Sequence, residues 1–255
     1  MFFFDTPNPA QMLVSFIVPV LNEVHTIEKC ITELPLQANK FGIATECILA
    51  DGGSTDGTQQ VLERVCGQFG SDRLRWIQTG KGRAVQMNAA SRLAHGEWLV
   101  FLHADTTLPH SSFEQFLAEI SEQGNTLNAV PRLTAGAFTF RVAHERRVYR
   151  YLEWYVAKRC RTLKLPFGDQ AIFALKEVFM RLGGYREDFP LMEDMAFVLK
   201  ANKDAGFRVL DAPVFTSARR YEQEGYWKRA AGNVYLQVLF RLGVHPKRLA
   251  AMYYK

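Results

Sequence analysis

The chain has 255 residues, of which 48% are apolar, and it carries a formal net charge of +5. This length and apolar content suffice for one sizeable core, and no stretch reaches the roughly 18 uninterrupted apolar residues of a membrane-spanning helix. The four cysteines form no CxxC pair and have no histidine partners at zinc spacing, which argues against a zinc site.

Short apolar runs alternate with helical patterns along the chain. Strands are predicted at Val14–Val20, Glu46–Ala50, Leu74–Ile77, Trp98–Leu102 and Gly136–Val142, and helices at Thr26–Asn39, Thr55–Phe69, Arg83–Ala94 and His144–Leu163. On the last helix, an inner face is predicted to hold Val148, Leu152, Tyr155 and Val156. The alternation predicts an α/β fold with a mostly parallel central sheet and helices on both faces.

The strand Trp98–Leu102 is apolar throughout, which is typical of a strand buried on both faces, and Asp105 follows it. Ligands of open α/β sheets bind outside the carboxyl ends of the strands, so Asp105 is placed to hold a divalent cation on a phosphate-bearing substrate. The alternative is a helix cap for the segment that begins at Pro109.

A second motif, residues 51–58 (Asp-Gly-Gly-Ser-Thr-Asp-Gly-Thr), follows the strand Glu46–Ala50. Gly52 and Gly53 allow close backbone approach, and the N-terminal amides of the next helix favour an anion. A nucleotide fits this place, although the spacing is not that of a dinucleotide fingerprint. A tight turn without a ligand is the alternative.

Three segments in this order resemble the successive motifs of glycosyltransferase family 2: residues 19–23 (Pro-Val-Leu-Asn-Glu), residues 51–58 and residues 101–105 (Phe-Leu-His-Ala-Asp). The resemblance continues through residues 168–170, 182–185 and 193–194, and so covers roughly residues 14–221. It implies a GT-A fold, a nucleotide-diphosphate sugar donor and inversion at the anomeric carbon. Residues 82–88 and 190–194 look closest to a small bacterial subgroup associated with selenium or arsenosugar genes.

The resemblance also implies roles for individual residues. The donor and its nucleotide are assigned to Pro19, Glu23, Asp51, Gly53, Arg83, Asn88, Ala104 and Arg220, with Asp51 reading the base, commonly uracil. The implied cofactor is a divalent metal, manganese or magnesium, held by Asp105. Where the usual motif has a first aspartate this chain has His103, which either ligates the metal or contacts the sugar or a phosphate.

Glu193 and Asp194 open a helical stretch whose apolar face is predicted to include Leu191, Met195, Val198 and Leu199. Neighbouring helical residues point about 100° apart, so the two carboxylates cannot face the same acceptor atom. The resemblance favours Asp194 as general base, with Glu193 in a different role. Asp169 is a second candidate for contacting the acceptor. Stabilisation of the first helical turn by acidic residues is the simpler alternative.

These expectations combine into an inverting, metal-dependent glycosyltransferase that moves a sugar, with UDP-sugar as the expected donor, to an unidentified acceptor. Residues 12–218 form the GT-A domain, divided into a nucleotide-sugar-binding half (12–105) and an acceptor half (106–218), and residues 219–255 form a helical appendage. The alternatives are a sugar-nucleotide pyrophosphorylase and a non-catalytic module that binds nucleotide sugars.

The positive charge is concentrated in two segments. Residues 219–255 contain eight Lys/Arg and two Asp/Glu, and residues 141–164 have the same balance. Such patches attract phosphates or anionic lipid, whereas no motif for reading nucleic acid accompanies them. In the appendage, a group of large apolar residues lies near a group of basic residues, which predicts either an interfacial membrane helix or a helix packed on the domain or on a second subunit. The apolar residues are Tyr235, Leu236, Leu239, Phe240 and Leu242, and the basic ones are Lys228, Arg229, Arg241, Lys247 and Arg248.

The N-terminal residues and the cysteines bear on the cellular location of the protein. Residues 1–5 have no basic region before their short apolar run and do not resemble a signal peptide, and the dispersed cysteines suit a reducing compartment. We expect a cytoplasmic protein, with peripheral contact at the inner membrane face left open.

Overall fold

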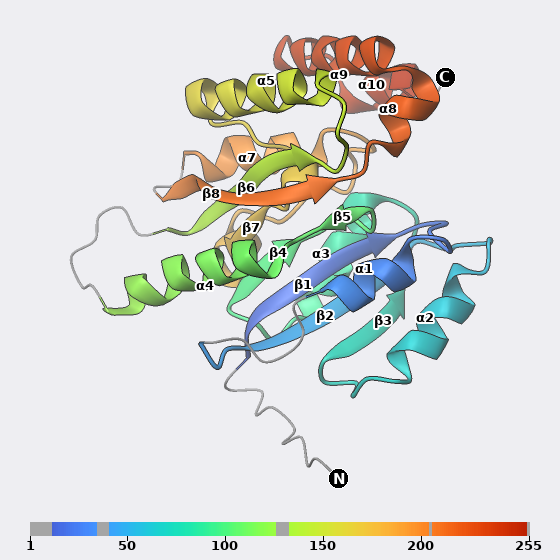
Figure 1. The fold of residues 1–255 in the computed structure, drawn as a ribbon, viewed down its shortest axis with the longest axis vertical. Coiled ribbons are helices and arrows are strands. Elements are labelled where there is room, and N and C mark those ends of the chain that lie inside the picture. Colours follow the sequence, from blue (N-terminus) through green and yellow to red (C-terminus); the bar gives the residue numbers. More distant parts are fainter. Residues whose placement is uncertain (1–11, 35–40, 126–132, 204–205, 254–255) are drawn as a thin grey trace.

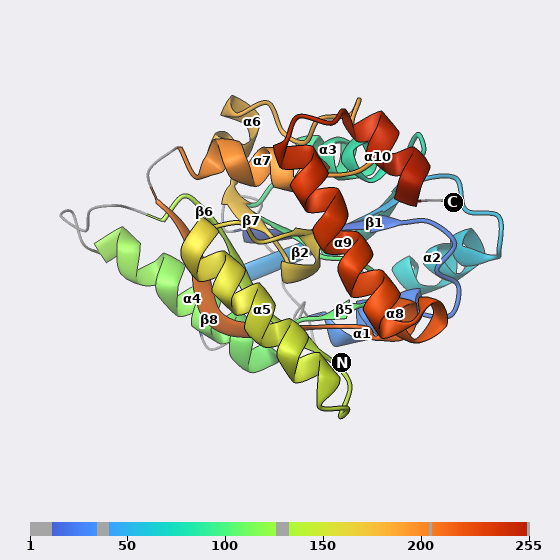
Figure 2. The ribbon, with the colours of Figure 1, turned by 90° about the horizontal axis from the view of Figure 1, so that it is seen from above.

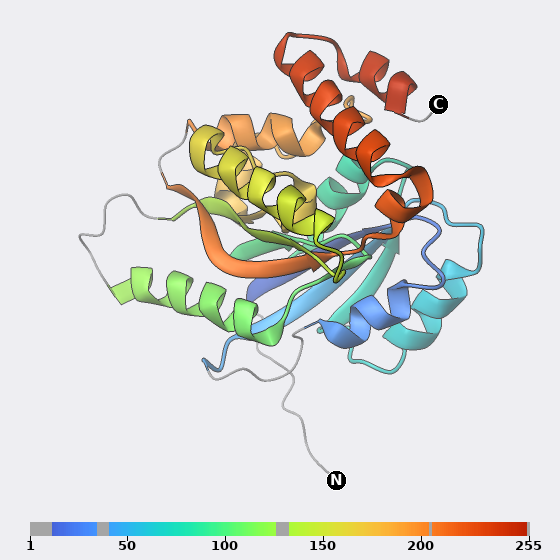
Figure 3. The same cartoon turned by 45° about the horizontal axis from the view of Figure 1, so that its top comes forward.

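The computed structural model describes residues 12–34, 41–125, 133–203 and 206–253. An eight-stranded mixed sheet runs through this part of the chain, with helices on both of its faces (Figures 1 and 3). In chain order the elements are β1 (Met12–Val20), α1 (Ile27–Glu33), β2 (Ala44–Asp51), α2 (Thr58–Cys66), β3 (Leu74–Gln78), α3 (Arg83–Leu93), β4 (Trp98–Phe101), β5 (Thr106–Thr107), α4 (His110–Asn125), β6 (Ala135–Val142), α5 (Val148–Leu163), the 3-10 turn η2 (Gly168–Gln170), β7 (Phe173–Leu175), α6 (Lys176–Arg181), α7 (Glu193–Ala201), β8 (Phe207–Thr216), α8 (Arg219–Glu224), α9 (Tyr226–Arg241) and α10 (Pro246–Tyr253).

The first half of the sheet confirms the predicted parallel arrangement. Strands β3, β2, β1 and β4 are neighbours in that order, and every pairing among them is parallel. In this register Val20 lies opposite Asp51, and Asp51 lies opposite Gln78. The loops that leave β1, β2 and β4 therefore emerge along one edge of the sheet.

The second half of the sheet is mixed. β7 pairs antiparallel with both β4 and β6, β8 is parallel to β6, and β5 pairs antiparallel with the end of β8. β5 and β7 contain only two and three residues, which is too short for a recognisable pattern of hydrophobicity. The predicted strand Gly136–Val142 corresponds to β6.

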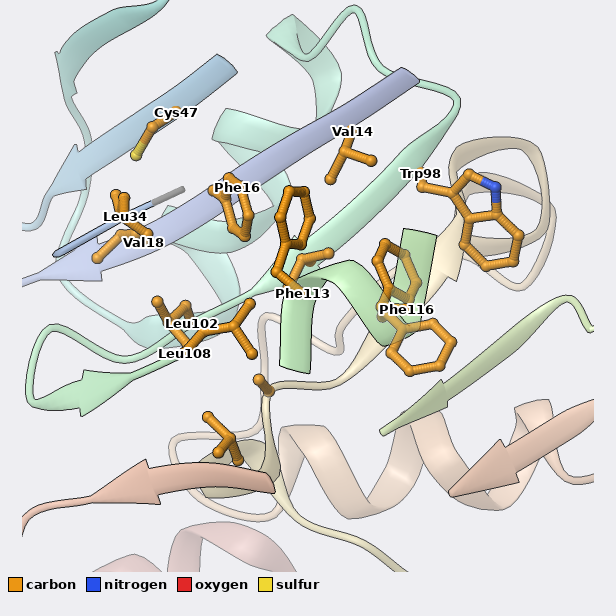
Figure 4. Close-up of a cluster of buried hydrophobic side chains, with 14 of the residues drawn as sticks. Val14, Phe16, Val18, Leu34, Cys47, Trp98, Leu102, Leu108, Phe113 and Phe116 are labelled. Carbon is orange, nitrogen blue, oxygen red and sulfur yellow. The ribbon is translucent and has the colours of Figure 1, made fainter. Parts of the chain in front are cut away.

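Two hydrophobic clusters sandwich the sheet. One, shown in Figure 4, packs α1, α2 and α4 against one face; Phe16 and Phe113 meet with ring centroids 5.3 Å apart, and Trp98 and Phe116 meet edge to face at 5.8 Å. The other packs α3, α7 and parts of α9 and α10 against the opposite face. Burial on both sides explains why the inner strands β1 and β4 are almost continuously apolar.

Some predicted details are corrected. The helix predicted at Thr26–Asn39 is α1, which ends at Glu33, and residues 35–40 lie outside the described part of the chain. Tyr155 was predicted on the inner face of α5 but is exposed, because the buried stripe runs through Tyr149, Leu152 and Val156 instead. On α7, Leu199 is exposed because it lies one residue, about 100°, beyond the buried Val198.

The C-terminal helices pack against the domain. Leu236 of α9 and Leu249 of α10 are buried in the second cluster, and Leu239 and Phe240 lie partly buried against it. The prediction that this tail helix packs on the domain is confirmed for these residues, whereas Tyr235 and Leu242 are exposed. Among the described helices, none is long and apolar enough to cross a membrane.

Candidate active site

The loops after β1 and β2 are tied to each other by hydrogen bonds. The amide of Asn22 donates to Ser54 Oγ over 2.8 Å, and the amide of Thr55 donates to Asn22 Oδ1 over 2.9 Å. The amide of Glu23 donates to Thr58 Oγ1 over 2.9 Å at the start of α2. Asn22 adopts a φ of 55°, which asparagine tolerates better than most residues. The predicted nucleotide-binding edge is therefore a cross-linked pair of loops.

Asp51 organises the second of these loops. Its buried carboxylate accepts hydrogen bonds from the amides of Gly53 and Ser54, from the Ser54 hydroxyl and from Gln59 Nε2, the last over 2.7 Å. Burial by itself raises the pKa of Asp51, but the hydrogen bonds from Ser54 and Gln59 outweigh it and lower the pKa below its usual value. Asp51 is thus an ionised acceptor facing N–H and O–H donors.

Gln86 is a site residue that the sequence reasoning missed. It is buried on α3, and its Nε2 donates to the carbonyls of Val20 and Ala50, each over 2.7 Å. A Cβ on Gly52 would stand 3.0 Å from the Gln86 amide, so this position has little room for a larger residue. An amide among the small and apolar residues of a helical face is the signal that would have indicated it.

His103, Gly168 and Asp194 meet beyond the end of β4. The Gly168 amide donates to Asp194 Oδ2 over 2.7 Å, and a Cβ on Gly168 would lie 3.0 Å from His103 Nε2 and 3.2 Å from Asp194 Oδ2. Burial lowers the pKa of His103 to about 3, and the charges of Arg83 and Arg220 act in the same direction. The imidazole is therefore neutral, which is the form that ligates metals and accepts hydrogen bonds.

Asp169 lies in η2 next to Gly168. Its Oδ1 is buried and has no hydrogen-bond partner among the described residues. Burial raises the pKa of Asp169 to about 6; the charges of Asp194 and Asp105 add to this, while Arg159 opposes it. A buried carboxylate oxygen without a donor is costly, and this one lies within electrostatic reach of two further carboxylates.

The two acidic residues at the start of α7 point to different partners, as their helical spacing requires. Glu193 is buried and forms an ion pair with Arg83 Nε over 2.8 Å. Burial raises the pKa of Glu193, although Arg83 opposes the shift. Asp194 is half-buried and accepts the bonds of the Gly168 and Met195 amides. Asp194 is therefore the carboxylate of this pair that faces His103 and η2.

These acidic groups suit a cation that is shared with a ligand. The described residues contain no group of three or more metal-ligating side chains in position to hold an ion by themselves. Magnesium and manganese bound to nucleotides commonly use one or two carboxylates and complete their shells with phosphate oxygens and water. Asp105, together with either the neutral His103 or the unpartnered oxygen of Asp169, fits such a partial set of one or two protein ligands.

Two arginines of α8 reach back toward the site. Arg219 Nη2 lies 3.3 Å from Glu23 Oε1, so the chain after β8 contacts the loop after β1. Arg220 contributes to the low pKa of His103, and its Nη1 donates to the hydroxyl of Tyr253 over 3.3 Å. Arg219 thus contacts the loop after β1, and Arg220 lies within electrostatic reach of His103.

Four further residues were predicted to bind the donor, namely Pro19, Gly53, Asn88 and Ala104, and three of them are buried. Pro19 is buried in β1 and pairs with Ala50, Ala104 is buried between His103 and Asp105, and Gly53 has a φ of 89° with open space around it. Asn88 is buried, and its side chain bonds the backbone of Tyr185 and Glu187 Oε1. In this structure Asn88 therefore anchors the loop before α7.

Comparisons with known proteins agree with this geometry. The model of the family described as "Glycosyl transferase family 2" matches residues 15–183. The succinoglycan biosynthesis protein ExoA of Rhizobium meliloti (strain 1021) is 27% identical over 198 residues, which are 76% of this chain and 58% of the relative. A PGL/p-HBAD biosynthesis glycosyltransferase of Mycobacterium bovis (strain BCG / Pasteur 1173P2) is 33% identical over 100 residues, 39% of this chain and 38% of the relative. The chain thus spans less than two thirds of the length of these relatives.

Solved structures show the same fold. The mannosyltransferase PcManGT of Pyrobaculum calidifontis, in complex with GDP-Man and Mn²⁺, has a TM-score of 0.62 at 22% identity and covers 94% of this chain and 68% of its own. S. aureus TarS 1-349 in complex with UDP-GlcNAc has a TM-score of 0.60 at 19% identity and covers 81% and 58%. The family match extends over most of the chain, and its motifs occupy the edge where the loops of β1, β2 and β4 meet. The chain belongs to glycosyl transferase family 2 and has the GT-A-like fold of these solved structures.

Proposed function

We propose that this protein is a glycosyltransferase that transfers a sugar from a UDP-sugar to an acceptor hydroxyl or similar nucleophile, with inversion at the anomeric carbon and with help from a divalent cation. The observation that carries the proposal is the position of Asp194. Its carboxylate accepts the hydrogen bond of the Gly168 amide, and both Asp194 and His103 lie against Gly168.

Donor binding is assigned to the loops after β1 and β2. Asp51 is proposed to read the base by accepting the imide N–H of uracil in place of the hydrogen bond from Gln59. The backbone of Gly53, with open space around it, allows the nucleotide to approach closely. Arg83 and Arg220 are proposed to bind the diphosphate, with Glu193 holding the guanidinium of Arg83 in place.

The cation would be held by Asp105, with His103 or Asp169 as further ligands, and phosphate oxygens would complete its shell. When bound, it neutralises charge that develops on the departing diphosphate. Asp194 is proposed to act as general base, taking the proton of the acceptor nucleophile as that atom attacks the anomeric carbon. Asp169 and Gly168 would then shape the acceptor side of the site.

We also propose that the chain divides into residues 12–105, 106–218 and 219–255 and that it is related to the selenium- or arsenosugar-associated subgroup. We propose a cytoplasmic location with peripheral membrane contact, and self-association. Asn88 is proposed to support the donor site through the loop at Tyr185 and Glu187.

The first test is a screen of nucleotide sugars for thermal stabilisation and for hydrolysis, with and without Mn²⁺. We expect stabilisation by one or more UDP-sugars and slow, metal-dependent release of UDP. Asp105→Ala should remove the enhancement of UDP binding by Mn²⁺ while leaving the unfolding temperature without ligand unchanged. Stabilisation without any turnover, even in the presence of acceptor extracts, would favour a non-catalytic binding module, and an unchanged Mn²⁺ effect in Asp105→Ala would contradict the assignment of the cation.

A further inference from the structure

Helices α5 and α9 each expose a row of large side chains. On α5, Tyr151 is 74% exposed and Trp154 is 61% exposed. On α9, Trp227 is 77% exposed and Tyr235 is 54% exposed. Single exposed apolar residues are ordinary, whereas aromatic side chains gathered on one face indicate an interaction surface.

The exposed residues recur at helical spacing, so each helix has an outer stripe opposite its packed face. The stripe of α5 consists of Tyr151, Trp154, Tyr155, Lys158, Arg161 and Thr162, and that of α9 of Trp227, Lys228, Ala231, Val234, Tyr235, Val238, Arg241 and Leu242. The inner faces pack on the domain through Leu152 and Val156 of α5 and Leu236 of α9.

Both stripes belong to one surface. Figures 1 and 2 show α5 and α9 on the same side of the molecule, running alongside each other with their N-terminal ends together. The hydroxyl of Tyr226 donates to the carbonyl of Val148 over 3.1 Å, and the rings of Tyr149 and Tyr226 meet edge to face at 5.6 Å. We call the two outer stripes together the α5–α9 face.

The charge of this face is positive. The sequence from Tyr226 onward contains no acidic residue, and the one acidic residue of α5, Glu153, is buried against Arg141 and the amide of Val142. Lys158 lies 5.2 Å from the ring of Trp154, so the cations and the aromatic rings are interleaved. Of the acidic residues on the neighbouring α8, Glu224 is ion-paired with Arg229, and Glu222 Oε1 lies 3.0 Å from Nε2 of His144.

We propose that the α5–α9 face is a docking surface for an anionic lipid bilayer. Tryptophan and tyrosine side chains favour the region of the headgroups, and helices with basic and aromatic outer faces lie in the plane of that interface. A second copy of the chain is disfavoured as the occupant, because a symmetric dimer would place the cations of this face against the same cations. The proposal does not depend on the proposed transfer reaction.

Docking in this orientation has a consequence for the site. The chain runs from the C-terminal end of α5 through Lys164 to Gly168, which contacts Asp194. The acceptor side of the site therefore lies near one end of the docking surface. If the proposed transfer reaction holds, docking through this face would bring the acceptor side of the site toward acceptors carried by the membrane.

Binding is measured by sedimentation of the full chain with phosphatidylcholine vesicles, with and without about one third phosphatidylglycerol. We expect binding only to the anionic vesicles and weaker binding as salt is raised. Lys158→Glu combined with Arg241→Glu should weaken binding by at least about 25-fold, at about fivefold for each cation lost. Lys29→Glu with Arg64→Glu, on α1 and α2, changes the net charge equally and should have less than about a twofold effect.

The aromatic residues are tested with brominated lipid, which quenches tryptophan fluorescence on contact. Quenching in anionic vesicles should fall to near zero in Trp154→Phe combined with Trp227→Phe, because Trp76 is partly buried and Trp98 is buried. All substituted side chains are exposed, so thermal unfolding should change little; the control variant also loses the surface ion pairs Lys29–Glu33 and Arg64–Glu28, which contribute little stability. Thermal unfolding serves as the check on folding.

Three results would overturn the proposal. The first is that the protein does not sediment with anionic vesicles at low salt. The second is that the α5–α9 variant and its α1–α2 control lose vesicle binding equally. The third is that brominated lipid quenches tryptophan fluorescence as strongly in the Trp154/Trp227 double variant as in the wild type. If light scattering showed a dimer that the α5–α9 variants dissociate while vesicle binding stays unchanged, a second copy would be the occupant instead.

Discussion

The two sides of the site differ in how their polar groups are satisfied. On the donor side, the loops after β1 and β2 close on themselves, with Asn22, Glu23 and Ser54 cross-linked and Asp51 accepting several hydrogen bonds. On the side proposed for the acceptor, Asp169 Oδ1 is buried without a hydrogen-bond partner among the described residues, as is Glu193 Oε2 at the boundary with the donor side, beside Arg83. The donor side is complete as it stands, whereas the acceptor side and this boundary have buried acceptors that a ligand or cation can satisfy.

This difference has a physical meaning for the two binding events. Loops that are held by their own hydrogen bonds lose little conformational entropy when a nucleotide binds, so they are preorganised. Buried oxygens without donors cost stability until a partner arrives, and such strain is typical of places where charge is bound or moved. Substitutions on the donor side should therefore change the Kd of the nucleotide, and substitutions on the acceptor side should change kcat.

The largest effect is expected on the acceptor side. Asp194→Asn keeps the size of the side chain but removes the base, so kcat should fall by about 10²–10⁴-fold while the Kd of the donor stays nearly unchanged. Steady-state kinetics and calorimetry with the UDP-sugar measure the two quantities.

Glu193→Gln is the matched control for this substitution, because it changes the adjacent carboxylate, which pairs with Arg83. A larger loss of kcat in the Glu193 variant would reverse the two roles. If neither variant lost tenfold, Asp169 would be the next base to test.

A smaller effect is expected on the donor side. Asp51→Asn replaces an acceptor with an amide, and it should weaken UDP by about 1.5–3 kcal/mol, or about 10- to 150-fold, while CDP, which has no imide N–H, loses less. Calorimetry with both nucleotides tests the difference.

Asp56→Asn is the control, since Asp56 ties the same loop through Val24 and Thr58 without being assigned to the base. Equal losses of UDP and CDP in the Asp51 variant would mean that Asp51 acts only on the conformation of the loop.

The smallest effect concerns the opposite edge of the donor side, where Glu46 holds the strands together. Its buried carboxylate accepts bonds from Ser15 Oγ and the His95 amide and pairs with Arg75 over 2.8 Å. Burial raises its pKa, but these partners outweigh burial and leave the pKa below the ordinary 4.5.

A carboxylate whose pKa is lower in the folded state contributes stability above its unfolded pKa and loses it as the pH falls. The free energy of unfolding should therefore decline below about pH 4.5, and Glu46→Gln should lower it by about 1–3 kcal/mol at neutral pH and flatten this decline. Urea unfolding at several pH values between neutral and acidic measures the free energy of unfolding and its decline. If the Glu46→Gln variant showed the same decline as the wild type, other groups would be its cause.

Much of the donor half was predictable because its signals are local. The apolar runs of β1, β2 and β4 and the glycine-rich turn after Asp51 each lie within a few residues of chain, and the carboxyl-end rule for parallel strands then places Asp51 and Asp105 on one edge. The acceptor half was harder, because β7 is three residues long and pairs between strands that are distant in sequence.

The sequence by itself determined the family, the order of strands and helices in the first half and the set of acidic candidates, since these depend on periodicity and motif spacing. Tertiary structure alone decided that Glu193 turns to Arg83 while Asp194 turns to Gly168, and that Arg219 reaches Glu23. It also decided that Tyr155 faces outward with Tyr151 and Trp154. The physical reason is that segments remote in sequence pack against one face of each helix and so decide which side chains turn inward. The periodicity along a single helix does not contain that information.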